Sequence, residues 1–239
     1  MSKYKLIPIV AVLVILGGGV WLATRRAPIP HEPIYQDKAI SVWLDDQHWI
    51  DGRIELTAAS VRAVQAIGTN AIPYLLATLE CSDSQTNSGI KHQQAMYGFR
   101  ALGMVAQPAV PKIVSLVLTS ADNGIHYAAI NALTSAPEEA ITLFVQALES
   151  QDSETRVRAA FALGCLRQAP QISVPALAKA LSDPDAKVRE GAVGSLGPYQ
   201  AYARPLIPQI TALLNDTNAS VRSRTTESLG LIQPRAVTP

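Results

Sequence analysis

The chain has 239 residues, of which 48% are apolar and 5% are aromatic. This apolar share excludes a largely disordered chain and is large enough for a sizeable core. The recurring alanines and leucines favour helices.

The formal net charge is +1, but the charges are unevenly distributed. Four of the 20 basic residues flank an N-terminal apolar run: Lys3, Lys5, Arg25 and Arg26. The other 16 stand against 19 acidic residues, so the rest of the chain carries about −3. A slightly acidic body is a poor match for phosphate backbones, and we expect no nucleic-acid partner.

The first predicted element is the uncharged 18-residue run from Leu6 to Ala23. As a helix it would be roughly 27 Å long, close to the hydrocarbon thickness of a bilayer. We therefore expect residues 1–26 to form a single N-terminal transmembrane helix that anchors the chain in a membrane. A cleaved signal peptide is the alternative.

The orientation of this segment depends on a small charge difference. Two basic residues lie on each side, and only the α-amino group favours a cytoplasmic N-terminus. We therefore expect a single-pass protein with its body on the extracytoplasmic, periplasmic side, or a secreted protein if the segment is cleaved. Residues 27–38 contain Pro28, Pro30 and Pro33, which is typical of a stiff spacer.

A two-residue marker, usually leucine and glycine, recurs through residues 39–239 at a similar spacing, and its last three occurrences are evenly spaced. The marker residues are Ile67-Gly68, Leu102-Gly103, Leu133-Thr134, Leu163-Gly164, Leu196-Gly197 and Leu229-Gly230. Because glycine readily adopts the left-handed conformation that ends many helices, the pattern predicts a helix that ends at each marker.

An apolar set spaced i, i+3, i+4, i+7 follows each of the first five markers, as in Ile72, Leu75, Leu76 and Leu79. This spacing predicts an amphipathic helix. One helical hairpin buries too little apolar surface to offset the entropy lost on ordering it, so neighbouring hairpins must stack. The sequence thus predicts an all-α fold: an α-solenoid of about five to six hairpins over residues 39–239.

Two stretches, "SDPDAKVREGAVGSLG" at residues 182–197 and "LIPQITALLNDTN" at residues 206–218, resemble the HEAT-repeat pattern in its short bacterial form. They are similar to the HEAT-like repeats of phycobilisome lyases, and the resemblance covers about residues 54–232. It implies an armadillo-like helical solenoid. The upstream stretch "YQDKAISVWLDD" resembles a leader found in some bacterial membrane-anchored members.

Three arginines, Arg156, Arg189 and Arg222, each stand seven residues before a marker leucine. The resemblance implies that this arginine pairs with an acid of an adjoining repeat, and three acids are available: Asp152, Asp183 and Asp216. The functional alternative is a ladder that binds an anionic ligand. We favour the structural role, because the same acids lie at helix starts, where capping explains them.

A candidate interaction surface comprises one residue from each second helix: Tyr74, Lys112, Gln146, Lys179 and Gln209. Their helical phase permits them to face the concave side of a solenoid. We expect a protein partner there.

No set of residues points to catalysis. None of the four histidines has a second metal ligand at a suitable spacing, and no hydrolase, phosphate-binding or zincin motif occurs. Cys165, within "ALGCL", is expected to be a buried thiol. We therefore expect no catalytic, metal or cofactor site, and a protein that is not an enzyme.

The C-terminal end raises a separate expectation. Continuing the spacing of the last units from Ile207 places the next second helix just beyond Pro239. Terminal repeats of solenoids need a polar outer face for solubility. We therefore expect the helix around residues 219–232 to expose an apolar edge, available for self-association or for a partner.

These features predict a membrane-tethered, non-catalytic scaffold for protein–protein contacts. One alternative is an enzyme component similar to the phycobilisome lyases, acting on a bound tetrapyrrole. Another is a DNA-binding protein similar to DNA glycosylases built on HEAT-like repeats. The first lacks an acid, base or cysteine cluster, and the second lacks a basic groove.

Overall fold

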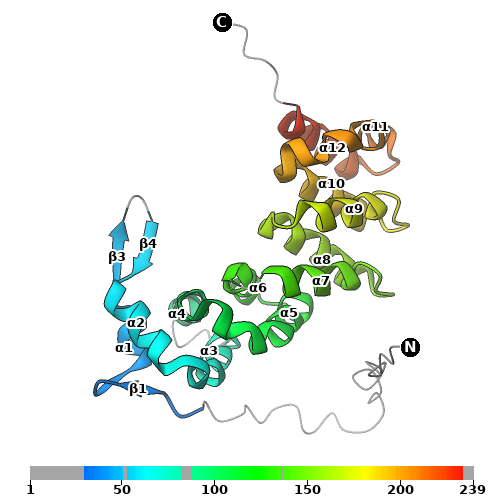
Figure 1. The fold of residues 1–239 in the computed structure, drawn as a ribbon. Coiled ribbons are helices and arrows are strands. Elements are labelled where there is room, and N and C mark those ends of the chain that lie inside the picture. Colours follow the sequence, from blue (N-terminus) through cyan, green and yellow to red (C-terminus); the bar gives the residue numbers. More distant parts are fainter. Residues whose placement is uncertain (1–29, 51–52, 82–87, 136, 234–239) are drawn as a thin grey trace, which may run out of the picture.

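The computed structural model describes residues 30–50, 53–81, 88–135 and 137–233. The predicted transmembrane run from Leu6 to Ala23 lies outside these residues. The described chain forms a curved array of helices preceded by a small leader (Figure 1). The predicted helical solenoid is therefore confirmed for the described residues.

Five helical hairpins and one further helix make up the described array. The first helices of the hairpins are α2 (Ala58–Ile67), α4 (Ser88–Leu102), α6 (Asn123–Ala132), α8 (Ser153–Leu166) and α10 (Ala186–Leu196), and α12 (Ala219–Ile232) follows them. The second helices are α3 (Ile72–Leu79), α5 (Val110–Thr119), α7 (Pro137–Ala147), α9 (Pro170–Ala180) and α11 (Ile207–Ala212). Short 3-10 helices lie between them: η1 (Gly68–Ala71), η2 (Gly103–Ala109), η3 (Leu133–Ser135), η4 (Gly197–Leu206) and η5 (Leu213–Asn215).

The leader contains strands that the sequence analysis did not predict. Its elements are β1 (Ile34–Tyr35), β2 (Lys38–Ala39), α1 (Ile40–Asp45), β3 (Gln47–Ile50) and β4 (Arg53–Leu56). Both strand pairs are antiparallel hairpins. The β1–β2 turn has positive φ at Gln36 and Asp37, as two-residue hairpin turns require. The predicted spacer, residues 27–38, therefore includes paired strands from Ile34 onward. The sequence did not predict them, because strands this short give no periodic signal.

Polar contacts and buried side chains of α1 join the leader to the array. The amide of Gln94 on α4 donates to Asp45 Oδ1 at 2.6 Å, and the hydroxyl of Tyr97 donates to the carbonyl of Ile54 at 2.8 Å. Within the leader, the backbone amide of Ser41 donates to Glu32 Oε1 at 2.7 Å. The contacts of Gln94 and Tyr97, together with the fully buried Ile40 and Leu44 of α1, dock the leader onto the first hairpins.

The core lies between the two layers of helices, where the predicted stripes point. Fully buried side chains from the second helices include Leu75, Ile113, Phe144, Leu177 and Ile210. Each occupies the i+3 position of its stripe, so the predicted amphipathic helices are confirmed. First helices contribute further core residues: Val64, Phe99, Leu163 and Leu196.

The marker glycines have two different roles. Gly68 and Gly103 have φ values of +63° and +58°, which agrees with the predicted left-handed ends. The predicted left-handed end is absent at Gly164 and Gly230, which lie inside α8 and α12. It is also absent at Gly197, which follows the end of α10 with a φ of −51°. A Cβ on Gly164 would lie 2.9 Å from the Cα of Ser195, so this glycine lets α10 approach α8 closely.

Close packing on one side explains the curvature. Small residues line the contacts between α8, α10 and α12; Gly164 faces Ser195, and Gly197 faces Ser228 one repeat later. The array therefore bends toward the first helices. In Figure 1, α4, α6, α8 and α12 lie along the inner side of the curve, and α3, α5, α7 and α9 lie along the outer side.

One described stretch, Ser88–Thr119, is apolar and long enough to cross a membrane by length and composition. It comprises α4, η2 and α5, which form a hairpin. The positive φ of Gly103 turns the chain between the two helices, and fully buried Phe99 and Val117 belong to the core. We therefore assign this stretch to the array.

Candidate interaction surface

The predicted interaction residues lie on the outer side of the array, so the expectation that they face the concave side is wrong. Tyr74, Lys112, Gln146, Lys179 and Gln209 belong to α3, α5, α7, α9 and α11. The close packing of the first helices sets the direction of curvature. Helical phase does not reveal this direction, because it depends on contacts between repeats.

Two of these outer residues have partners within the chain. Tyr74 is half-buried, and desolvation and the nearby carboxylate of Glu32 raise the pKa of its hydroxyl. Lys112 forms an exposed ion pair with Glu80 at 2.8 Å. Gln146, Lys179 and Gln209 belong to the same outer layer of helices. Two of the five residues are thus engaged within the chain.

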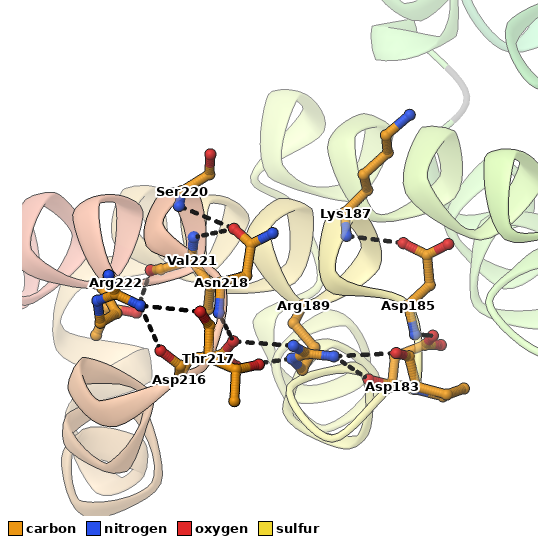
Figure 2. Close-up of polar contacts among 12 residues, drawn as sticks. Asp183, Asp185, Lys187, Arg189, Asp216, Thr217, Asn218, Ser220, Val221 and Arg222 are labelled. Atoms are coloured by element: carbon orange, nitrogen blue, oxygen red, sulfur yellow. Dashed lines mark hydrogen bonds and ion pairs between the residues drawn. The ribbon is translucent and has the colours of Figure 1, made fainter.

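The arginine–aspartate ladder runs through the last units (Figure 2). Arg156 donates from Nε and Nη2 to the two carboxylate oxygens of Asp183, at 2.8 and 2.9 Å. Arg189 holds Asp216 in the same way, again at 2.8 and 2.9 Å. Bidentate pairs of this kind are short, directional and stronger than neutral hydrogen bonds.

Each ladder arginine also anchors its own turn. Nη1 of Arg189 donates to the carbonyl oxygens of Asp183 and Pro184, and Nη1 of Arg222 donates to those of Asp216 and Thr217. The side chain of Asp216 is thus held by one arginine while its carbonyl is held by the next. The ladder forms a continuous chain of contacts between consecutive units.

The ladder lowers the pKa values of its aspartates. For Asp216, hydrogen bonds from Arg189 and from the amide of Asn218 stabilise the carboxylate and lower its pKa. For Asp183, desolvation favours the protonated form, but hydrogen bonds from Arg156 and the amide of Asp185 outweigh it, and the pKa is again lowered. Both groups stay charged at neutral pH, which suits a structural role.

Asp152 does not join the ladder, although the sequence analysis grouped it with Asp183 and Asp216. Its carboxylate caps α8 by accepting from the amide of Thr155 at 2.8 Å. The residue equivalent to Asp183 is Ser150, six residues before Arg156, just as Asp183 lies six residues before Arg189. The two-residue offset between pairing acid and capping acid caused the misassignment.

A groove lies on the concave side, across α8, α10 and α12. It has a volume of about 520 Å³, and its apolar residues include Val157, Phe161, Cys165 and Pro198. Gly191 and Gly194 of α10 also line it, and the side chain of Arg224 packs against Gly194. A smaller adjoining depression shares Gly164, Cys165 and Pro198 and extends toward α6.

Exposed aromatic residues border this groove. Tyr127 on α6 is 54% exposed and Phe161 on α8 is 36% exposed, and their ring centroids lie 5.9 Å apart. His126 packs against Phe161 with a centroid distance of 5.5 Å. Desolvation lowers the pKa of His126, so its ring is neutral at pH 7. The rings form an apolar contact surface.

The sequence patterns did not predict this groove. Phe161 stands on α8 between the buried residues Ala160 and Ala162, so its outward position can be inferred from helical phase. The spacing of Gly191 and Gly194 on the next first helix was a second available signal. Neither identifies a groove without knowledge of which helices line the concave side.

Cys165 is exposed in the groove, contrary to the predicted buried thiol. Cys165 follows Gly164, where α8 and α10 meet, but its side chain is exposed and lines the groove. Desolvation by the surrounding apolar residues raises the pKa of the thiol, which therefore remains protonated and weakly nucleophilic at neutral pH. Among the described residues there is no group of three or more His, Cys, Asp or Glu side chains that could hold a metal ion.

The exposed side of α12 is largely polar, so the predicted apolar edge is wrong. Thr226 is exposed where the equivalent residue of the preceding unit is the fully buried Val193. Likewise Glu227 stands where the preceding unit has Gly194. Of the large apolar side chains of α12, Leu231 alone is exposed, near the end of the helix. The described face of α12 therefore offers no continuous apolar edge.

Comparison with protein families supports the repeat assignment. Residues 141–230 match the family described as HEAT repeats. The predicted resemblance to HEAT repeats is therefore confirmed for this part of the chain, which contains α8 to α11 and most of α7 and α12. None of the curated proteins matches the chain.

Several solved structures are similar to the chain at low identity. An engineered protein has 20% identity over 81% of this chain and 87% of its own, with a TM-score of 0.41. The complex of CpcE and CpcF of phycocyanin lyase from Nostoc has 21% identity over 67% and 64%, with a TM-score of 0.42. Human deoxyhypusine hydroxylase in complex with glycerol has 19% identity over 73% and 78%, with a TM-score of 0.40. Scores this low carry no argument about activity.

Proposed function

We propose that this protein is a non-catalytic scaffold that binds a partner protein in the concave groove of its HEAT-like array. The observation that carries the proposal is the exposed apolar surface formed by Tyr127, Phe161 and the groove beside them. Exposed aromatic residues beside a hollow are typical of the anchor positions in protein interfaces.

The charges around the groove favour an acidic partner. Among the residues that line the groove and the adjoining depression, Arg167, Lys187 and Arg224 are basic, and Glu190 is the only acid. Arg224 is paired with Glu227, outside the groove lining, at 2.7 Å. We therefore propose a partner segment that combines an apolar anchor with net negative charge.

The proposal includes a membrane tether. The run from Leu6 to Ala23 has the length and composition of a single transmembrane helix, which would hold the array close to a membrane surface, on the periplasmic side by the charge count. Cysteine labelling by a membrane-impermeant reagent tests this side. Labelling of exposed Cys165 in intact spheroplasts supports the proposal, and labelling only after lysis contradicts it.

Cross-linking in intact cells followed by affinity capture and mass spectrometry tests the scaffold. The full-length chain is compared with Phe161→Glu and, as a matched control, with Gln146→Glu on the outer side. We expect one protein at near-stoichiometric yield with the wild type and the control, and a loss of about ten-fold with Phe161→Glu, since an interface anchor contributes about 1–2 kcal/mol or more.

Purified components provide the second step of this test. The affinity of the recovered partner should fall as ionic strength rises, because the proposed segment is acidic and the groove basic. Equal capture by wild type and Phe161→Glu contradicts the groove as the binding surface.

A further inference from the structure

The last arginine of the ladder differs from the two before it in one respect. Arg156 and Arg189 each use Nε and Nη2 to hold an aspartate of the following unit. For Arg222, the contacts among the described residues are those of Nη1 with the carbonyl oxygens of Asp216 and Thr217, at 2.7 and 3.1 Å. Its Nε and Nη2 edge faces no carboxylate of the described chain.

This edge is already positioned. The same two carbonyl contacts orient Arg156 and Arg189, whose distances to their turns are 2.8 and 3.1 Å and 2.9 and 3.1 Å. Arg222 therefore holds its guanidinium in the orientation that receives a carboxylate in the two preceding units, and Figure 2 shows Arg189 and Arg222 in successive turns. Such preorganisation lowers the entropy lost when a ligand binds.

The other end of the ladder has no such open edge. Seven residues before the marker Leu133 stands His126 in place of arginine, and the position that would supply the carboxylate is Ser150. Both partners of that pair are therefore replaced together. At the Arg222 end, the arginine is kept although α12 presents a polar face, with Thr226 and Glu227 exposed.

We propose that Arg222 is a binding site for an aspartate side chain of a partner protein. The aspartate would lie in a turn of the form Asp-x-Asx, because both occupied sites receive such a turn. Oδ1 of Asp183 accepts from the amide of Asp185, and Oδ1 of Asp216 accepts from the amide of Asn218. This inference deepens the proposed scaffold function and rests on it: the partner would contact the end of the ladder as well as the groove.

The test uses a probe of known sequence. The peptide acetyl-Leu-Leu-Asn-Asp-Thr-Asn-amide, which copies residues 213–218, is added to the full-length ¹⁵N-labelled chain in detergent micelles, and the Nε–Hε signals of its arginines are followed by NMR. Arg156 and Arg189 serve as internal references, because their edges are occupied. Arg204 is exposed and serves as the control for unspecific attraction.

We expect a saturable shift at Arg222, with an apparent affinity at least about three-fold higher than at Arg204, since a bidentate charged contact is stronger than unspecific attraction. The same peptide with asparagine in place of aspartate should not produce it. Similar titrations at Arg222 and Arg204, or an equal response to the asparagine peptide, overturn the inference. The Nε–Hε signal that disappears in the Arg222→Lys variant is the signal of Arg222.

Capture from cells separates this inference from the proposed function. If the partner is lost with Phe161→Glu but fully retained with Arg222→Gln, the scaffold stands and the carboxylate site falls. If Arg222→Gln lowers the recovery of the partner protein several-fold while Arg204→Gln does not, the carboxylate site at Arg222 is supported. If no protein depends on Phe161 although the peptide binds Arg222, the groove proposal falls and the carboxylate site stands.

Discussion

The second half of the array, from α7 to α12, repeats one set of contacts in each unit, whereas the first half, from the leader to α6, uses contacts that occur once. Arg156–Asp183 and Arg189–Asp216 have the same geometry in successive units. In the first half, Gln94–Asp45 and the Tyr97 contact to the Ile54 carbonyl have no equivalents in the ladder.

This difference follows from the spacing of the units. A ladder requires that each arginine reach the same turn of the following unit, and the even spacing of the markers Leu163, Leu196 and Leu229 preserves that register. The earlier markers, from Ile67 to Leu133, are unevenly spaced, and the leader supplies other contacts instead. The comparison teaches that a solenoid can be stabilised by a repeated interaction or by individual ones, but only the first is visible as a sequence pattern.

The largest expected effect separates the interior of the repeated half from its end. Val193→Glu places a charge at a fully buried position and should lower the free energy of unfolding by about 3 kcal/mol or more, because the carboxylate loses its hydration. Thr226→Glu at the equivalent exposed position should change it by less than about 0.5 kcal/mol. Urea unfolding measures both. Equal destabilisation would show that the α12 face is covered.

A smaller effect is expected where two first helices meet. Gly164→Ala adds a Cβ at 2.5 Å from Ser195 Oγ and 2.9 Å from its Cα, and we expect a loss of about 1–3 kcal/mol from overpacking. Gly230→Ala is the control, since a Cβ there meets nothing within 4 Å, and it should be neutral or stabilising by up to about 1 kcal/mol through helix propensity. Thermal unfolding of the two variants measures the change in stability. An unchanged stability of Gly164→Ala would contradict the close contact between α8 and α10.

The ladder itself should contribute in a pH-dependent way. The folded-state pKa of Asp216 lies below its ordinary value, so the ion pair stabilises the fold above the unfolded-state pKa of about 3.9 and this stability is lost as the pH falls through the folded-state pKa. Asp216→Asn should therefore cost about 1–2 kcal/mol at pH 7 and progressively less below pH 4. Urea unfolding of wild type and variant from pH 7 to pH 2 measures the difference, and a pH-independent gap would contradict this account.

The smallest expected effect concerns a contact of the first half. Tyr97→Phe removes the hydroxyl that donates to the carbonyl of Ile54 and should cost about 0.5–1.5 kcal/mol, since a single neutral hydrogen bond contributes that much. Hydrogen exchange should be faster in the β3–β4 hairpin and unchanged in α10. Faster exchange in α10 as well would show that the two halves unfold together.

Local patterns in the sequence were sufficient for the helices and their stacking. The stripes identified the buried faces of the second helices, from Leu75 to Ile210, because burial on one side imposes a period of about 3.6 residues. The equivalent arginines Arg156, Arg189 and Arg222 also stood out, since repeats of one length place equal residues in equal surroundings. The marker glycines were recognised, although Gly164 lies inside α8 and permits helix contact, and Gly197 follows the end of α10 without a left-handed conformation.

Only the tertiary structure decided which helices line the concave side. Curvature depends on how closely neighbouring helices approach, which is set by pairs such as Gly164 and Ser195 that lie in different repeats. It also decided that Asp152 caps a helix while Asp183 holds an arginine, because both positions precede a helix and differ by two residues. The groove beside Phe161 and the open edge of Arg222 are likewise properties of several units together, and such relations across repeats leave no period in the sequence.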